Sequence, residues 1–155
     1  MCLLAYLAIA VPGKWFPSVP ERASGAAQLS MPRGVAAKSG DELIVTRAAE
    51  DGNTVISVTT DIRALDYPVV AWIAAGFAAD ARVALLWQTD VEPSRVNKRP
   101  LEVEGGQLLP ADLHGDPHWL GRVVGLALVV QGPIEAPLRI RGVIAKPAGA
   151  LDTLR

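Results

Sequence analysis

The amino-acid sequence predicts an all-β sandwich, and three observations support this prediction. Runs of valine, isoleucine, threonine and aromatic residues recur along the chain, and residues typical of turns separate them. The 14 glycines and 12 prolines are spread through the 155 residues, as expected when turns join many short strands. The alanine-rich stretch 72–82 contains Gly76 and has β-branched flanks, which disfavours a long helix there.

The runs predict about eight to nine strands. In chain order they are expected at 28–31, 43–46, 54–60, 67–75, 82–89, 100–104, 107–113, 122–131 and 138–146. The turn Asp51-Gly52-Asn53 predicts a β-hairpin of 43–46 and 54–60. Gly105-Gly106 predicts a tight turn between 100–104 and 107–113.

The chain length fits one domain with a two-layer core. Residues 41–147 are expected to form the sandwich, and 148–155 a C-terminal tail. Residues 17–40 are rich in Pro, Ser, Gly and Ala, and we expect them to form a linker. Cys2 is the single cysteine of the sequence, so no intrachain disulfide and no cysteine-based metal site can form.

The N-terminal segment 1–16 begins with an uncharged apolar run, Met1 to Val11. This run is too short to cross a bilayer as a helix. Trp15, Phe16 and Lys14 follow it, which is the residue mixture of a membrane interface. We therefore expect the end of an export signal or a partial membrane anchor, with the domain outside the cytoplasm. A buried first strand or helix is the alternative.

The charge pattern excludes one class of partner. Fifteen basic and 16 acidic residues give a net charge of -1 and are mixed along the sequence. Because no basic stripe is present, nucleic acid is not an expected partner. The expected partner is a glycan or a protein. Membrane association through the N-terminus is also expected.

The sequence lacks the motifs of common catalytic sites, so we do not expect an enzyme or a bound cofactor. No Gly-x-Ser-x-Gly elbow and no glycine-rich phosphate loop occurs. The two histidines, His114 and His118, lie in one turn-rich loop where Gly115 and Pro117 break any helix. A zinc site there, with Asp112 or Asp116, is the less favoured alternative to solvated histidines. The acidic residues Asp61, Asp66, Glu102 and Glu104 are the candidates for a glycosidase pair, and nothing in their spacing sets up a cleft.

The tryptophans and the polar residues near them are the candidate ligand-binding residues. In the strand 82–89, Val83, Leu85 and Trp87 share one face, and both faces are largely apolar, which predicts a central strand with Trp87 inside. Sugar binding would use an aromatic platform beside planar polar groups. The candidates for such a site are Trp87, Gln88, Asp90, Arg99 and Trp119, with Arg95 and Asn97 close in sequence.

Four segments resemble a known family. They read DIRALDYPVVAW (61–72), ARVALLWQT (81–89), DLHGDPHWLGRVVGLAL (112–128) and LRIRGVI (138–144). In this order they resemble the conserved segments of galactose-binding-like jelly rolls, which include carbohydrate-binding modules, and Trp119-Leu120-Gly121 is the most specific part. The resemblance implies a jelly-roll β-sandwich of antiparallel strands that binds glycan. An interaction domain that contacts other proteins through a strand edge or an apolar patch is the alternative.

Overall fold

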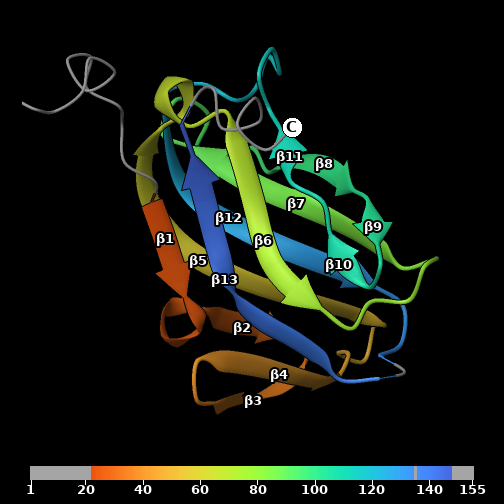
Figure 1. Cartoon of the computed structure of the whole chain (residues 1–155). Coiled ribbons are helices and arrows are strands. Elements are labelled where there is room, and N and C mark those ends of the chain that lie inside the picture. Colours follow the sequence, from red (N-terminus) through yellow and green to blue (C-terminus); the bar gives the residue numbers. More distant parts are fainter. Residues whose placement is uncertain (1–21, 135, 148–155) are drawn as a thin grey trace, which may run out of the picture.

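The protein folds as two antiparallel β-sheets packed face to face (Figure 1). A computed structural model describes residues 22–134 and 136–147. The eight-stranded sheet, here sheet A, contains β1 (Arg22–Gly25), β3 (Val35–Ser39), β4 (Glu42–Arg47), β6 (Val69–Ala75), β9 (Val103–Glu104), β10 (Gln107–Leu108), β11 (Ala111–Asp112) and β13 (Leu138–Lys146). The five-stranded sheet, here sheet B, contains β2 (Ser30–Arg33), β5 (Asn53–Arg63), β7 (Arg82–Thr89), β8 (Asn97–Leu101) and β12 (Arg122–Gln131).

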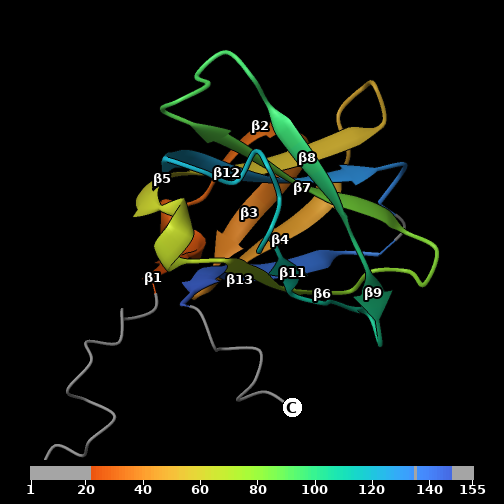
Figure 2. The same ribbon diagram turned by 90° about the horizontal axis from the view of Figure 1, so that it is seen from above.

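From β4 to β7, successive strands alternate between the two sheets. Sheet A runs in the order β3-β4-β13-β6-β10-β9, with β1 beside β13 and β11 beside β6, and sheet B runs β2-β5-β12-β7-β8. The strands β4, β5, β6 and β7 therefore lie in sheets A, B, A and B. Figure 2, seen from above, shows the two layers with the connecting loops at the two ends of the sandwich. The described residues thus confirm the all-β sandwich.

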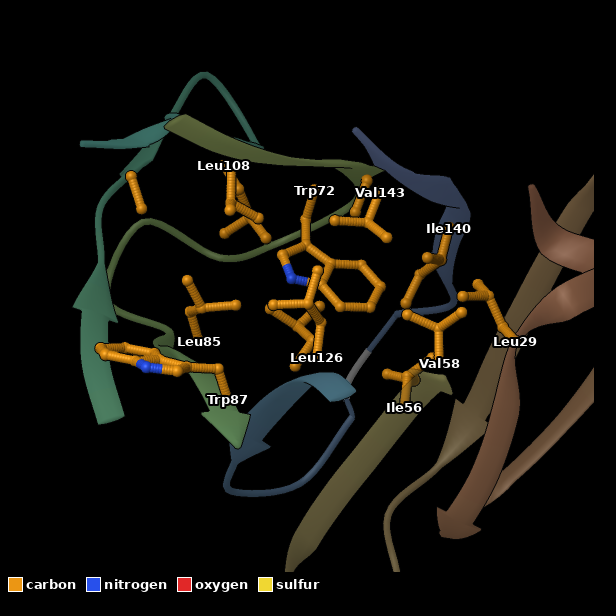
Figure 3. Packing of buried hydrophobic residues seen from close by; sticks show 14 of the residues in the cluster. Leu29, Ile56, Val58, Trp72, Leu85, Trp87, Leu108, Leu126, Ile140 and Val143 are labelled. Carbon is orange, nitrogen blue, oxygen red and sulfur yellow. The ribbon is translucent and has the colours of Figure 1, made fainter. Parts of the chain in front are cut away.

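The core lies between the sheets and follows from the two-residue periodicity of the strands. Val83, Leu85 and Trp87 point inward from β7 and are buried, as the sequence predicts for a central strand. Figure 3 shows Trp72 pointing from β6 into the same cluster, between Val143 of sheet A and Leu126 of sheet B. The Trp72 indole N–H has no hydrogen-bond partner among the described residues.

The hairpin predicted at 51–53 is wrong, although the turn itself is present. Asn53 donates its backbone N–H to Asp51 Oδ1 at 3.0 Å, and Gly52 donates to the Ala49 carbonyl at 2.9 Å. The two flanking strands nevertheless belong to different sheets, because β4 pairs with β13 and β5 pairs with β12. The turn residues determine a local change of direction, whereas the pairing partner comes from distant strands.

The linker predicted at 17–40 is corrected for residues 22–39. These residues form β1, β2 and β3, which pair with β13, β5 and β4. Gly142 makes the first pairing possible: its φ is 151°, and a Cβ there would overlap the Ser24 carbonyl oxygen. Alanine and serine are poor β-formers, so the composition of 22–39 predicts a linker, and the edges of already formed sheets supply the pairing instead.

The described part contains thirteen strands, more than the eight to nine predicted. Two of the additional strands are β1 and β3, whereas β2 overlaps the strand predicted at 28–31. The region predicted as 100–104 and 107–113 is divided into the short strands β8, β9, β10 and β11. The tight turn at Gly105-Gly106 is confirmed, because β9 and β10 pair antiparallel around it.

Both ends of the predicted domain map fall outside the described residues. The signal or anchor predicted at 1–16 and the tail predicted at 148–155 are not covered. Within the described ranges, the helices are short 3-10 turns, and none has the length and apolar character needed to cross a membrane.

Candidate functional site

Trp87 and Trp119, two of the predicted ligand-binding residues, belong to the core. Their rings meet edge to face, with centroids 5.5 Å apart and planes at 79°, and the residues are 2% and 5% exposed. The Trp87 indole N–H donates to the His118 carbonyl at 2.9 Å, and the Trp119 indole N–H donates to the carbonyls of Ala64 and Tyr67. A ring enclosed in this way cannot stack on a sugar, so their predicted role as a binding platform is corrected.

Arg99 and Asp116 fix the loop that contains Trp119. Arg99 donates one N–H to the Asp112 carbonyl at 3.0 Å and another to Asp116 Oδ2 at 2.8 Å. The other oxygen of Asp116 accepts the backbone N–H of His118 at 2.9 Å. Partial burial raises the pKa of the Asp116 carboxyl, but the His118 N–H and the Arg99 guanidinium outweigh this, and the net pKa is lowered.

Asp90 also accepts a backbone hydrogen bond at the end of this loop. Its Oδ1 atom accepts the N–H of Arg122 at 2.9 Å. Gly121, just before Arg122, has φ 65°, and a Cβ there would collide with Val91 and with Asp90 Oδ1. The glycine of the predicted Trp119-Leu120-Gly121 segment is therefore required by the backbone and by the close approach of the 90–91 loop.

Gln88 points in the opposite direction from Trp87, because adjacent residues of a strand face opposite sides of the sheet. Its side-chain amide donates to the Pro93 carbonyl at 3.3 Å and lies along the outer face of sheet B. The five predicted residues thus lie close together in the fold, but they do not converge on one open surface. We call the structure formed by Arg99, Asp116, Asp90 and the two tryptophans the loop network.

The residues considered for a zinc site and for a glycosidase pair have other contacts in the structure. Asp112 and Asp116 accept the backbone N–H groups of His114 and His118, as expected in Asx turns. Within 22–134 and 136–147 no three His, Cys, Asp or Glu side chains are grouped so that they could hold a metal ion. Of the four acidic candidates, Asp61 pairs with Arg122 in sheet B, Asp66 with Arg63, and Glu104 lies on β9 of sheet A.

Every aromatic side chain in the described residues is buried. Tyr67, Trp72, Phe77, Trp87 and Trp119 are between 2% and 6% exposed. An aromatic platform for the apolar face of a pyranose is therefore absent from the described surface. Any site on this surface must use polar groups and aliphatic side chains.

The outer face of sheet A has a hollow that fits this description. The strand register places Ile44, Arg139, Ala75 and Gln107 side by side across β4, β13, β6 and β10. Next to this row, Ile73 of β6 pairs with Gly142, and it is 40% exposed because the glycine has no side chain to cover it. Ile73, Ala75, Gln107 and Arg139 line a hollow of about 310 Å³.

Glu42 and two arginines provide the polar groups of this hollow. Arg139 donates from Nη1 to Glu42 Oε1 at 3.2 Å, and Arg141 donates from Nε to Glu42 Oε2 at 3.3 Å. The two arginine side chains are 64% and 61% exposed, whereas the Glu42 side chain is 16% exposed. The carboxylate therefore orients two guanidinium groups that still face solvent. We call the hollow lined by Glu42, Ile73, Gln107, Arg139 and Arg141 the sheet A groove.

The residues of the sheet A groove are not among those predicted from the sequence. The alternation in Leu138–Lys146 places Arg139 and Arg141 on the outer face, and this local signal could have identified them. Their proximity to Glu42 and Ile73 depends on the strand order β4-β13-β6, which no local pattern indicates.

A second polar hollow, of about 300 Å³, lies between β1 and β5. Asp61 lies in it and accepts a hydrogen bond from Arg122 Nε at 2.6 Å. That hydrogen bond and the charges of Arg122 and Arg22 lower the pKa of the Asp61 carboxyl. No exposed large apolar side chain borders this hollow within the described residues, so it lacks the mixed character of the sheet A groove.

The outer face of sheet B carries two more hollows, and both are lined mainly by small or aliphatic side chains. Their volumes are about 340 and 350 Å³. The register places Pro100, Ala84, Val129 and Val55 in one row across the sheet. Val96 and Val124 border one of the hollows and are 57% and 38% exposed.

Comparison with known proteins agrees with the fold. No family model matches the chain, and no curated protein matches it. Among solved structures it is similar to a low-affinity xylan-binding module, CBM86, from Roseburia intestinalis. The TM-score is 0.59 at 12% identity, and the match covers 85% of this chain and 98% of that one.

Two weaker similarities have TM-scores below 0.5. One is a family two carbohydrate esterase from Cellvibrio japonicus, with a TM-score of 0.48, 5% identity and coverage of 83% of this chain and 34% of that one. The other is TmCBM61, solved in complex with β-1,4-galactotriose, with a TM-score of 0.39, 13% identity and coverage of 83% and 88%.

Sheet topology and the CBM86 similarity together define the class of fold. The chain is a jelly-roll β-sandwich of the architecture found in carbohydrate-binding modules, which confirms the fold implied by the sequence resemblance. At 12% identity the similarity indicates a shared fold and does not identify a ligand.

Proposed function

We propose that the protein is a non-catalytic accessory domain that binds a glycan in the sheet A groove. The observation that carries this proposal is the arrangement of Arg139 and Arg141 around Glu42 beside the exposed Ile73. The similarity in fold to the xylan-binding module adds support.

The groove has the chemistry that a sugar ring requires. A pyranose offers hydroxyl groups at its rim and C–H groups on its faces. Arginine N–H groups and the Gln107 amide can bind hydroxyl oxygens, and Glu42 can accept hydroxyl protons. Ile73 offers an aliphatic contact for the C–H face. Because an aliphatic side chain replaces an aromatic platform, we expect low affinity, with Kd values near the millimolar range, about -4 kcal/mol of binding free energy.

Affinity gel electrophoresis of the full chain against a panel of soluble polysaccharides tests this proposal. The double variant Arg139→Ala/Arg141→Ala should lose the retardation that the wild-type chain shows. Arg33→Ala is the matched control, because Arg33 is also a half-exposed arginine in an ion pair, with Asp51 at 2.9 Å, and it lies on sheet B. Equal retardation of all three proteins would contradict the groove as the site, and no retardation on any polysaccharide would contradict glycan binding.

We also propose that the domain works outside the cytoplasm, held at or exported across a membrane by its N-terminal segment. The support is the uncharged run Met1 to Val11 and the aromatic pair Trp15-Phe16. Cell fractionation with an accessible C-terminal tag tests this proposal. Recovery of the tag only in the cytoplasmic fraction would contradict it.

A second candidate function, protein–protein contact, is favoured by the outer face of sheet B. Its residues Val129, Leu86 and Ala127 form a surface without aromatic groups, bordered by the exposed Val96. Such a surface is typical of contact with another protein. Size-exclusion chromatography with light scattering, over a range of concentrations, should then show self-association that Val96→Lys abolishes. A monomer at all concentrations would exclude a homotypic contact.

A further inference from the structure

We infer that the ligand of the sheet A groove is an anionic polysaccharide whose sugar residues carry carboxylate groups. This inference rests on the proposed function, since it names the substrate class of the same groove. Among the residues that line the groove, two guanidinium groups share one carboxylate, so the lining keeps one positive charge in excess, and Glu104 lies outside it, opposite Gln107 on β9.

Most hydrogen-bond donors of the groove are unused within the described residues. Each guanidinium has five N–H donors. Arg139 and Arg141 each give one of them to Glu42 and have no other partner in the described part of the chain. A neutral sugar would compete with water for the remaining donors without a gain in charge pairing. A carboxylate would accept two parallel N–H groups from one guanidinium in a charge-assisted contact.

The position of Glu42 keeps the donors aimed at an incoming anion. Its side chain is only 16% exposed, and each of its oxygens accepts one N–H from an arginine. A ligand carboxylate therefore approaches the exposed guanidinium edges and not the Glu42 charge. Arg139 and Arg141 lie two residues apart on one face of β13, and both guanidinium groups contact the same Glu42 carboxylate, at 3.2 and 3.3 Å, so neighbouring carboxylates of one chain can contact both.

The buried aromatic residues support the same ligand class. Stacking on an exposed aromatic ring can hold the apolar face of a neutral sugar, and each described aromatic side chain is 6% exposed or less, so the described surface does not offer this contact. Charge pairing with the two exposed arginines is therefore the main source of binding affinity in the groove.

Isothermal titration calorimetry of the full chain with two forms of one polymer tests the inference. Polygalacturonate should bind at least about tenfold more tightly than its methyl ester, a difference of about 1.4 kcal/mol. The affinity should also fall as salt is raised from about 50 to 300 mM, because salt screens charge contacts at a partly exposed site. Poly-glutamate is the control for charge without sugar, and it should bind at least about tenfold more weakly than polygalacturonate.

The variant Glu42→Gln gives the sharpest result, because the two ligand classes predict opposite signs. In this variant the amide oxygen can still accept an arginine N–H and hold that guanidinium in place, while the loss of the negative charge raises the positive charge of the groove, so binding of polygalacturonate should become several-fold tighter. If Glu42 instead accepts hydroxyl protons from a neutral sugar, the same variant should bind more weakly. A thermal melt of the variant shows whether it is folded, and the salt dependence of the wild-type chain tests the inference without any substitution.

The outcomes separate the inference from the proposed function. Binding of neutral polysaccharides at the groove, with no preference for the acidic polymer, would overturn the inference and leave the proposed function standing. Binding of poly-glutamate as tight as that of polygalacturonate would overturn the inference as well. No binding of any polysaccharide would overturn both.

Discussion

Two regions of this molecule pair arginine with a carboxylate, and they use the pair differently. In the loop network, Arg99 is 35% exposed and Asp116 14% exposed, and both also bind backbone atoms of the 112–118 loop. In the sheet A groove, Arg139 and Arg141 are more than 60% exposed and bind only the Glu42 carboxylate within the described residues. The same residue types thus fix a loop in one region and present free donors in the other.

This difference shows that residue type and sequence proximity do not identify a binding site. Trp87, Arg99 and Trp119 have the composition of a sugar site, yet their N–H groups donate to backbone carbonyls of the 112–118 and 64–67 segments. A binding site needs polar groups that are oriented by the protein and still incompletely paired. The sheet A groove meets that condition.

The largest effect is expected in the loop network, from Trp119→Ala. The residue is 5% exposed, packs against Trp87 and donates to two carbonyls. Truncation should lower the free energy of unfolding by about 3–5 kcal/mol, measured by urea denaturation with circular dichroism. A loss below about 1 kcal/mol would contradict its role in holding the loop.

Matched phenylalanine variants separate hydrogen bonding from ring volume. Trp119→Phe leaves the Ala64 and Tyr67 carbonyls without their donor, whereas Trp72→Phe removes an N–H that has no partner in the described residues. Both variants lose the same ring volume. Trp119→Phe should therefore be the less stable by about 1–3 kcal/mol, and equal unfolding free energies would contradict the role assigned to these hydrogen bonds.

Asp116→Asn should give a smaller loss of stability, and the loss should depend on pH. The pKa of the Asp116 carboxyl is lowered in the folded protein. Its ionised form therefore stabilises the fold above the ordinary value of about 3.9, and that contribution disappears as the pH falls through the lowered pKa. The variant should lose about 1–2 kcal/mol near pH 7.

Urea denaturation of both proteins between about pH 2 and pH 7 checks this prediction. The difference between wild type and Asp116→Asn should be constant above about pH 5 and should shrink below about pH 4. A difference that grows on acidification would contradict the sign.

The smallest effect on stability is expected in the sheet A groove. Arg139→Ala/Arg141→Ala removes two exposed ion pairs to Glu42, so the unfolding free energy should change by no more than about 1 kcal/mol. Arg99→Ala should cost more than the double variant, because the Asp112 carbonyl and Asp116 lose their donor. Thermal melts of the two variants check this order. A larger loss of stability in the double variant than in Arg99→Ala would contradict the roles assigned to the two regions.

The sequence predicts the long strands well, because their alternation is a local property. The runs at 54–60, 82–89, 122–131 and 138–146 all lie in strands of the structure. It does not predict which sheet each strand joins, as the turn at 51–53 shows. Strand pairing is decided by contacts far apart in sequence, and β1 joins β13 only because Gly142 admits its backbone.

The site was harder to predict for the same reason. Local pattern places Trp87 inside correctly, but it does not show that Trp119 also turns inward to reach the carbonyls of Ala64 and Tyr67. Glu42 and Arg139 are separated by almost the whole domain and meet because β4 and β13 are neighbours. A site built across strands becomes visible only when the strand order is known.

The central claim is that ligand contacts the sheet A groove and leaves the loop network unchanged. Nuclear magnetic resonance titration of the 15N-labelled chain with an acidic oligosaccharide tests it most directly. We expect shifts in the Nε–H signals of Arg139 and Arg141 and in the Ile73 amide, with the indole signals of Trp87 and Trp119 unmoved. Shifts in the two indole signals, with the groove signals unchanged, would contradict it.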